Sequence, residues 1–224
     1  PSIILDLDGT LVDTETVARG VLLATVREFH LPVSEQDLAA VVGSPDRLAG
    51  LLAARAARTG IDVRDVLRHY QEELVRTFHV RGVRAFPGAE VLLSRLRAFG
   101  WPFAVASSSP RERVELSLCL SGLRPLVDVL VTGDEVAERK PAPDLFLLAC
   151  RRLGAERGRA VAVEDTPVGL QAARRAGLRC VAVCHTVPPA ELRGADEVVG
   201  TIAQVTPEIL ARVAGTSMDS SPIG

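Results

Sequence analysis

The sequence predicts an α/β protein with a doubly wound parallel sheet and an inserted all-helical domain. Three observations predict it. Short apolar runs rich in Val and Ala recur along the chain, and each ends in polar or turn residues. Helical patterns alternate with the later runs, as in βαβ units. Residues 8–101 separate the first apolar run from the second, a distance far too long for one crossover helix.

The apolar runs have the length and composition of parallel strands that are buried on both faces. We expect strands at IILDL (3–7), PFAVAS (102–107), VDVLVT (127–132), AVAVE (160–164) and CVAVC (180–184). The helical patterns that alternate with them lie at 88–99, 110–121, 143–153 and 167–176.

The long stretch after the first strand reads as four helices. We expect them at 15–29, 35–42, 45–59 and 63–79, with Ser34 and Ser44 as caps and Pro45 at a first helical position. The expected domains are an α/β core of residues 1–14 and 81–214, a helical domain of residues 15–80, and a disordered polar tail of residues 215–224.

Composition excludes several classes of protein. The chain of 224 residues is 47% hydrophobic, with a net charge of -2 in which acids and arginines are interspersed. This pattern offers no basic face for nucleic acid and no cationic stripe for a membrane surface. No window of about 18 apolar residues could span a bilayer, and PSIILDL lacks the features of a signal peptide. We therefore expect a cytoplasmic protein.

The four cysteines fit that expectation. Cys180 and Cys184 lie in one predicted strand, where four residues span about 13 Å, beyond the limit of about 7 Å for a disulfide. No CxxC spacing indicates a zinc site.

Ligands bind at the carboxyl ends of the strands in such a sheet, so the polar residues there are candidates for a site. At the end of the first strand, Asp6 and Asp8 are two residues apart, a spacing that aims both carboxylates the same way in extended chain. Two adjacent buried carboxylates repel unless a cation or a shared proton compensates. The alternative is a tight Asp-Gly turn with solvated acids, which does not account for the apolar strand before it.

The second strand ends in VASSSP. We expect Ser109 to be an N-cap, with Pro110 at the first helical position. Ser107 and Ser108 exceed what a cap needs, and hydroxyls with free N–H groups at a helix N-terminus make an anion site. Capping alone remains the alternative.

A later strand ends in AVAVEDTP. Thr166 and Pro167 are expected to cap and open the next helix, which leaves Glu164 and Asp165 as a second acidic pair at the edge of the sheet. The alternative is that both acids serve only the dipole of that helix.

Lys140 is the single lysine among the 26 lysines and arginines, and it lies in ERKPAPDLF (138–146). Two acidic pairs, a hydroxyl cluster and one lysine at the same rim of a sheet indicate phosphoryl transfer with a divalent cation. Carboxylate and carbonyl oxygens suit Mg²⁺, and a carboxylate can attack phosphorus once the charge of the phosphate is neutralised. Chance is the alternative, since some basic residue had to be the lysine.

These motifs resemble, in order, the four motifs of the haloacid dehalogenase superfamily, whose core is Rossmann-like. The helical insertion after DLDGTLVDTE resembles its C1-type cap, and the most similar branch is the β-phosphoglucomutase-like phosphatases. The matching residues are Asp6-Leu7-Asp8-Gly9-Thr10, Ser107, Lys140-Pro141 and Glu164-Asp165.

The resemblance implies a role for each motif. Asp6 would be the nucleophile that forms an aspartyl-phosphate, and Asp8 the general acid and base. Mg²⁺ would be held by the carboxylate of Asp6, the backbone carbonyl of Asp8, Asp165 and, directly or through water, Glu164. The phosphate would be bound by Thr10, Ser107, the N–H of Ser108 and Lys140, which would bridge a phosphate oxygen and Asp6.

Residues of the cap are expected to contact the leaving group of the substrate and determine specificity. Arg19 and Arg47 are the candidates, followed by His69, although each could be a solvated helix residue. β-Phosphoglucomutases place a histidine in the first cap helix, at the position that Ala18 occupies here.

The sequence thus predicts a monomeric, Mg²⁺-dependent phosphatase of a small phosphorylated metabolite, expected to be a sugar phosphate. The alternative is a β-phosphoglucomutase. A more remote one is a phospho-receiver module, which needs a shorter chain, no helical cap and no second acid two residues after the first.

Overall fold

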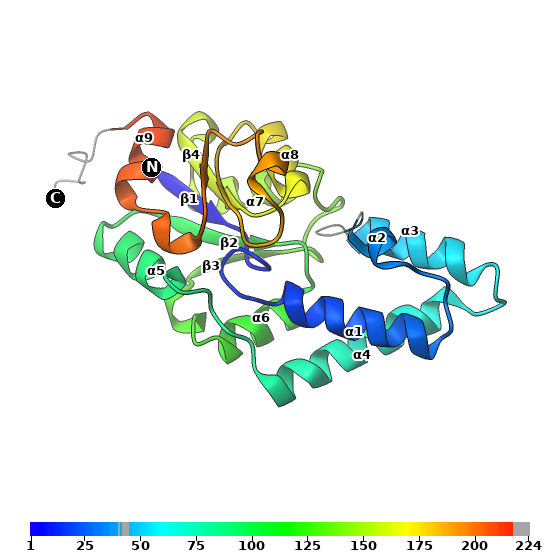
Figure 1. The fold of residues 1–224 in the computed structure, drawn as a ribbon. Helices are drawn as coiled ribbons and strands as arrows, with labels where there is room; N and C mark the ends of the chain where they lie inside the picture. The colour runs from blue at the N-terminus through cyan, green and yellow to red at the C-terminus, as the bar shows by residue number, and fades with distance from the viewer. Residues whose placement is uncertain (40, 42–44, 217–224) are drawn as a thin grey trace. The chain divides into compact units, whose positions relative to one another are not determined.

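The computed structural model describes residues 1–39, 41 and 45–216 (Figure 1). The chain folds into two compact units, one formed by Pro1–Asp13 and the chain from Arg84, the other by Thr14–Val83. Ser44, predicted as a helix cap, and residues 217–224 of the predicted tail lie outside the described residues.

The first unit contains a six-stranded parallel sheet in the order β3-β2-β1-β4-β5-β6. The predicted doubly wound α/β fold is confirmed, because the chain moves outward from β1 to β3 and then returns to β4 on the other side of β1. The strands are β1 (Ser2–Leu5), β2 (Phe103–Ser107), β3 (Val129–Thr132), β4 (Ala160–Glu164), β5 (Arg179–Val183) and β6 (Glu197–Val199).

The helices of this unit alternate with the strands along the chain. The four predicted helices are confirmed to within a residue or two at each end, the usual uncertainty of helix boundaries. They are α5 (Ala89–Ala98), α6 (Arg111–Leu120), α7 (Asp144–Leu153) and α8 (Pro167–Arg175), and the unpredicted α9 (Pro207–Ala214) packs against β4 and β5. Short 3₁₀ turns are η1 (Arg124–Leu126), η2 (Arg157–Arg159), η3 (Pro189–Glu191) and η4 (Ile202–Gln204).

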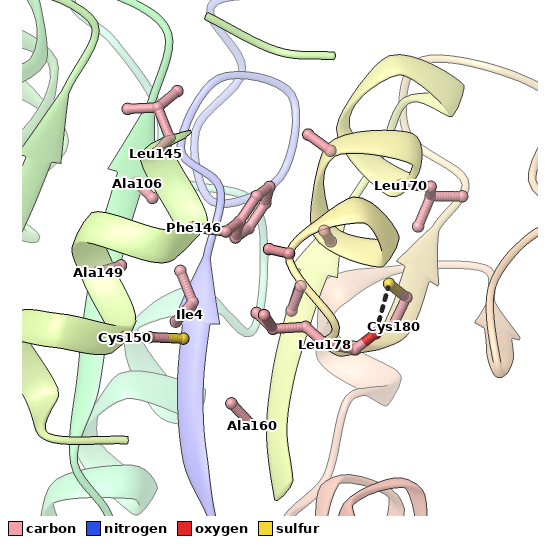
Figure 2. Packing of buried hydrophobic residues seen from close by; sticks show 14 of the residues in the cluster. Ile4, Ala106, Leu145, Phe146, Ala149, Cys150, Ala160, Leu170, Leu178 and Cys180 are labelled. Carbon is pink, nitrogen blue, oxygen red and sulfur yellow. Dashed lines mark hydrogen bonds between the residues drawn. The ribbon is translucent and has the colours of Figure 1, made fainter. Parts of the chain in front are cut away.

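Small residues line the face of the sheet that α7 and α8 cover. Every second residue of the central strands belongs to this face, and most of these residues are alanine, which lets the helices approach closely. Figure 2 shows the ring of Phe146 pointing from α7 across β1 toward α8, with Ile4 of β1 below it and Leu170 on the far side of α8. Phe146 and Ile4 are fully buried, so this layer supplies much of the rigid support beneath the carboxyl ends of the strands.

The second unit is helical. It consists of α1 (Glu15–Glu28), α2 (Glu35–Ala39), α3 (Pro45–Ala56) and α4 (Val63–Arg81), with α1 and α3 packed against α4. The predicted cap at Ser34 is confirmed, because its Oγ accepts a hydrogen bond of 3.1 Å from the backbone N–H of Asp37. Helix α3 ends three residues earlier than predicted, and the predicted end of α2 at residue 42 lies outside the described residues.

In the described part of the chain, no helix combines the length and the apolar character needed to cross a membrane. All four cysteines are free thiols in the structure. Cys180 is buried, as predicted, whereas Cys184 is only partly buried.

Candidate active site

The turn after β1 carries the first two acids of the candidate site. The strand ends at Leu5, two residues earlier than predicted, and the backbone N–H groups of Thr10, Leu11 and Val12 then donate to the carbonyl of Leu7. Gly9 has a φ of 82°, and a Cβ there would lie 2.1 Å from Oδ2 of Asp165. The turn therefore needs glycine both for its conformation and for its approach to the second acidic motif.

Lys140 lies between two buried carboxylates. Its Nζ is 2.5 Å from Oδ1 of Asp6 and 2.6 Å from Oε1 of Glu164, and it also donates to the carbonyl of Ala106 at 3.2 Å. The exposed fractions of Lys140 and Asp6 are only 4% and 6%. These three acceptors match the three protons of an ammonium group.

Burial and the neighbouring charges act against each other on Asp6 and on Lys140. Burial raises the pKa of the Asp6 carboxyl, against the opposing attraction of the Lys140 ammonium, and the neighbouring Glu164 and Asp8 raise it further. Burial alone would lower the pKa of Lys140, but Asp6 and Glu164 together raise it above its ordinary value. Lys140 therefore remains charged, and its ammonium opposes the rise that burial causes in the pKa of Asp6.

Both carboxylate oxygens of Glu164, at the end of β4, accept hydrogen bonds. Its Oε2 accepts from the backbone N–H of Asp165 at 3.2 Å and from Oγ1 of Thr166 at 3.3 Å, while Oε1 meets Lys140. Thr166 also caps α8 as predicted, accepting from the N–H of Gly169. A Cβ on Gly169 would lie 2.0 Å from the carboxylate of Glu164, so this glycine provides the space for the acid.

Each carboxylate oxygen of Asp165 accepts a hydrogen bond from a threonine hydroxyl. Oγ1 of Thr10 donates to Oδ1 at 3.1 Å, and Oγ1 of Thr186 donates to Oδ2. Thr10, predicted to bind phosphate, thus contacts an acid of the site. Thr186 was not among the predicted residues, although HTVPP after the fifth strand follows the same rule of polar residues at a carboxyl end.

Three of the acids could hold a metal ion. Asp6, Glu164 and Asp165 each offer a carboxylate oxygen, and these atoms all lie within 4.8 Å of one another. A buried cluster of carboxylate oxygens suits Mg²⁺, which prefers oxygen ligands and is commonly held by a few carboxylates. The residues present therefore fit the ion that the sequence predicts.

The serine cluster contacts Asp8. Oγ of Ser107 and Oγ of Ser109 donate to Oδ2 of Asp8 at 2.8 and 2.9 Å. The prediction that Ser109 caps α6 is wrong, because that helix begins at Arg111 with Pro110 as its extended N-cap. Ser109 serves Asp8 instead. Oγ of Ser108 is buried and has no hydrogen-bond partner within the described structure.

Two of the three predicted substrate residues of the helical unit, Arg19 and His69, have partners within that unit. Arg19 forms an exposed ion pair of 3.0 Å with Glu35 within that unit. Arg47 is exposed on α3, and His69 contacts Glu28 at 3.1 Å. Their roles toward a substrate stay predictions.

His185 is a further residue that the sequence did not indicate. Its Nδ1 lies 3.0 Å from the carbonyl of Gly9, and its Nε2 accepts from the N–H of Ile202 at 3.2 Å. The ring stacks on Phe86, with 3.9 Å between the ring centroids. Burial lowers the pKa of His185, in keeping with a neutral ring whose Nδ1 donates to the turn of the first motif.

A parallel sheet with acids, serines and one buried lysine at its carboxyl edge defines a hydrolase of the haloacid dehalogenase class. The family model described as haloacid dehalogenase-like hydrolase matches residues 3–183, so the chain belongs to this family. The resemblance of the motifs to the haloacid dehalogenase superfamily is thereby confirmed.

Several proteins and solved structures are similar to this chain over most of its length. Validoxylamine A 7′-phosphate phosphatase of Streptomyces hygroscopicus subsp. limoneus is 31% identical over 213 residues, 90% of this chain and 94% of that protein. Fructose-1-phosphate phosphatase YqaB of Escherichia coli strain K12 is 32% identical over 185 residues, 81% of this chain and 95% of that protein. The structure of CbbY from Rhodobacter sphaeroides in complex with phosphate has 29% identity and a TM-score of 0.76, covering 91% of this chain and 95% of that one.

Proposed function

We propose that this hydrolase is a Mg²⁺-dependent phosphatase that acts on a small phosphorylated metabolite of the sugar phosphate class and forms an aspartyl-phosphate on Asp6. The observation that carries the proposal is the buried Lys140, which joins Asp6 and Glu164 beside Asp165. Relatives named as phosphatases of sugar-like phosphates support the substrate class.

Asp6 has the properties of a nucleophile that attacks phosphorus. It is buried and lies next to a positive charge, so its carboxylate is poorly hydrated while its charge is held by Lys140. An oxygen of Asp6 would form a bond to phosphorus as the bond from phosphorus to the leaving oxygen breaks. The N–H of Ser108 and Lys140 would bind the phosphate oxygens, where negative charge has to be offset. Ser107 donates its one hydroxyl proton to Asp8, so it would bind phosphate only by turning that proton away from Asp8.

Asp8 is the acid and base of the proposal. It would donate a proton to the leaving oxygen and later take one from the water that attacks the phosphoryl group on Asp6. Oδ2 of Asp8 accepts hydrogen bonds from the hydroxyls of Ser107 and Ser109, and these bonds would orient the carboxyl group for proton transfer. Hydrolysis would return Asp6 to its carboxylate and release inorganic phosphate.

The metal would be held by Asp6, Asp165 and Glu164, together with the backbone carbonyl of Asp8. When bound, Mg²⁺ would supply positive charge to the phosphate oxygens. Thr10 and Thr186 would fix the orientation of Asp165, because each donates to one of its oxygens.

A screen of phosphorylated metabolites tests the proposal through released phosphate. We expect turnover of at least one sugar phosphate in Mg²⁺, loss of turnover in EDTA, and recovery when Mg²⁺ is added back. Asp6→Asn is the matched control, because it removes the nucleophilic charge while keeping the size of the side chain. Full activity in a metal-stripped sample would refute the metal requirement.

A further inference from the structure

A chain of hydrogen bonds leads from Asp8 to an arginine that the sequence did not indicate. Nη2 of Arg113 donates to Oγ of Ser109 at 2.7 Å, and Oγ of Ser109 donates to Oδ2 of Asp8 at 2.9 Å. Arg113 and Ser109 are four residues apart, and Arg113 lies in the first turn of α6. The guanidinium is therefore connected to the general acid of the proposed reaction by a single hydroxyl group.

Proton counting fixes the direction of these bonds. A guanidinium has only donors, so the Ser109 oxygen must accept from Arg113, and its one hydroxyl proton goes to Asp8. Ser107 is constrained in the same way, because its Oγ accepts the backbone N–H of Ser109 at 3.0 Å and donates its proton to Asp8. Oδ2 of Asp8 thus accepts two hydrogen bonds from hydroxyl groups. The direction of each is fixed by the donor that the same hydroxyl oxygen accepts from, Arg113 for Ser109 and the backbone N–H of Ser109 for Ser107.

Arg113 lies outside the serine motif and supplies the hydrogen bond that orients the Ser109 hydroxyl. If Arg113 were absent, the Ser109 hydroxyl could rotate and donate elsewhere, and Oδ2 of Asp8 would lose one of its two hydrogen bonds from the serines. The carboxyl group would then be less firmly oriented toward the leaving oxygen. Small errors in the orientation of a catalytic group are costly in rate.

We propose that Arg113 is a positioning residue for Asp8 that acts through Ser109, an inference that rests on the proposed function. It predicts a dependence on the leaving group that a general loss of structure would not produce. An alkyl leaving group needs the proton of Asp8, whereas a good aryl leaving group such as p-nitrophenolate departs without it.

The experiment compares kcat/KM of Arg113→Gln for p-nitrophenyl phosphate and for an alkyl phosphate that the wild type hydrolyses. We expect a loss of about tenfold with the alkyl phosphate and a change within about twofold with the aryl phosphate. Arg113→Lys keeps a positive donor and should recover part of the loss. Arg111→Gln is the matched control on the same helix, because Arg111 pairs with Glu135 at 2.9 Å, and it should behave as wild type.

A double-mutant cycle tests whether Arg113 acts through Ser109. Ser109→Ala should lower kcat/KM for the alkyl phosphate, and adding Arg113→Gln to it should cause no further loss. Independent, multiplying losses, or equal losses on both substrates, would overturn the role of Arg113 while leaving the phosphatase intact. A wild type that releases phosphate from neither substrate nor any sugar phosphate would instead overturn the proposed function.

Discussion

Replacing Lys140 by arginine preserves the charge of the site but changes its shape. The ammonium donates to three acceptors around one nitrogen, at 2.5 Å to Asp6, 2.6 Å to Glu164 and 3.2 Å to the carbonyl of Ala106. The ring of Phe146 lies behind it, with its centroid 5.2 Å from Nζ. A planar guanidinium is larger and spreads its donors over a fork, so it must displace Asp6 or withdraw from it.

The structure sets the expected size of the effect. Adding bulk to a closed, well-packed position costs about 1–3 kcal/mol, so Lys140→Arg should still fold. Losing one well-placed electrostatic contact in a site of this kind costs roughly 3–4 kcal/mol of transition-state stabilisation. We therefore expect a kcat/KM on the order of a hundredfold lower than that of the wild type. Lys140→Ala should be at least as poor and less stable by about 3–5 kcal/mol, because it leaves two buried carboxylates without their cation.

Phosphate release and thermal unfolding, measured on the same samples, separate the loss of activity from loss of folding. Arg151→Lys, the reverse exchange at an exposed position of α7, is the matched control and should match the wild type in both assays. A Lys140→Arg enzyme within about threefold of wild-type kcat/KM would refute the placement of Lys140 between the nucleophile and Glu164.

Further predictions concern three other features. Gly169→Ala should lower kcat/KM by at least about tenfold, because its Cβ would displace Glu164, whereas Gly20→Ala on α1, with open space around it, should be neutral or stabilising by up to about 1 kcal/mol. Wild-type turnover by Gly169→Ala would contradict this. His185→Phe should destabilise the fold at about pH 7.5, as measured by urea unfolding. Since the folded pKa of His185 is lowered, its contribution is complete above the unfolded value and is lost as the pH falls through the folded one. The difference from wild type should therefore shrink toward about pH 5, and a widening difference would argue against the bond from Ile202. With β-glucose 1-phosphate and a trace of the bisphosphate, we expect release of phosphate or no reaction; rapid accumulation of glucose 6-phosphate would favour a mutase.

The sequence predicted the sheet well because its central strands are buried on both faces. Such strands appear as continuous apolar runs that need no partner to be recognised. β6 was missed for the opposite reason. It is a three-residue edge strand, Glu197–Val199, whose side chains are exposed or half-buried, so its pattern resembles a loop. Helix α9 went unpredicted although Thr206 and Pro207 give a cap and a first helical position.

The site was predictable in its parts but not in its pairings. The acids and the serines lie at or just after the ends of strands β1, β2 and β4, a rule that can be applied to the sequence alone, whereas Lys140 lies in the loop between β3 and α7. Which hydroxyl serves which acid depends on contacts between residues far apart in the chain, such as Ser109 with Asp8 and Thr10 with Asp165. A serine before a proline has the same local pattern whether it caps a helix or binds a carboxylate, so the assignment of Ser109 to a cap failed.

The identity of the phosphorylated group is the most direct test of the account. The enzyme is mixed with a substrate found in the screen, quenched in acid within the first turnovers, digested, and the peptide that contains Asp6 is analysed by mass spectrometry. We predict a phosphoryl group on Asp6 in the wild type and none in Asp6→Asn, with slower loss of the group in Asp8→Asn. Phosphate release without any phosphoryl group on Asp6, or normal turnover by Asp6→Asn, would contradict the account.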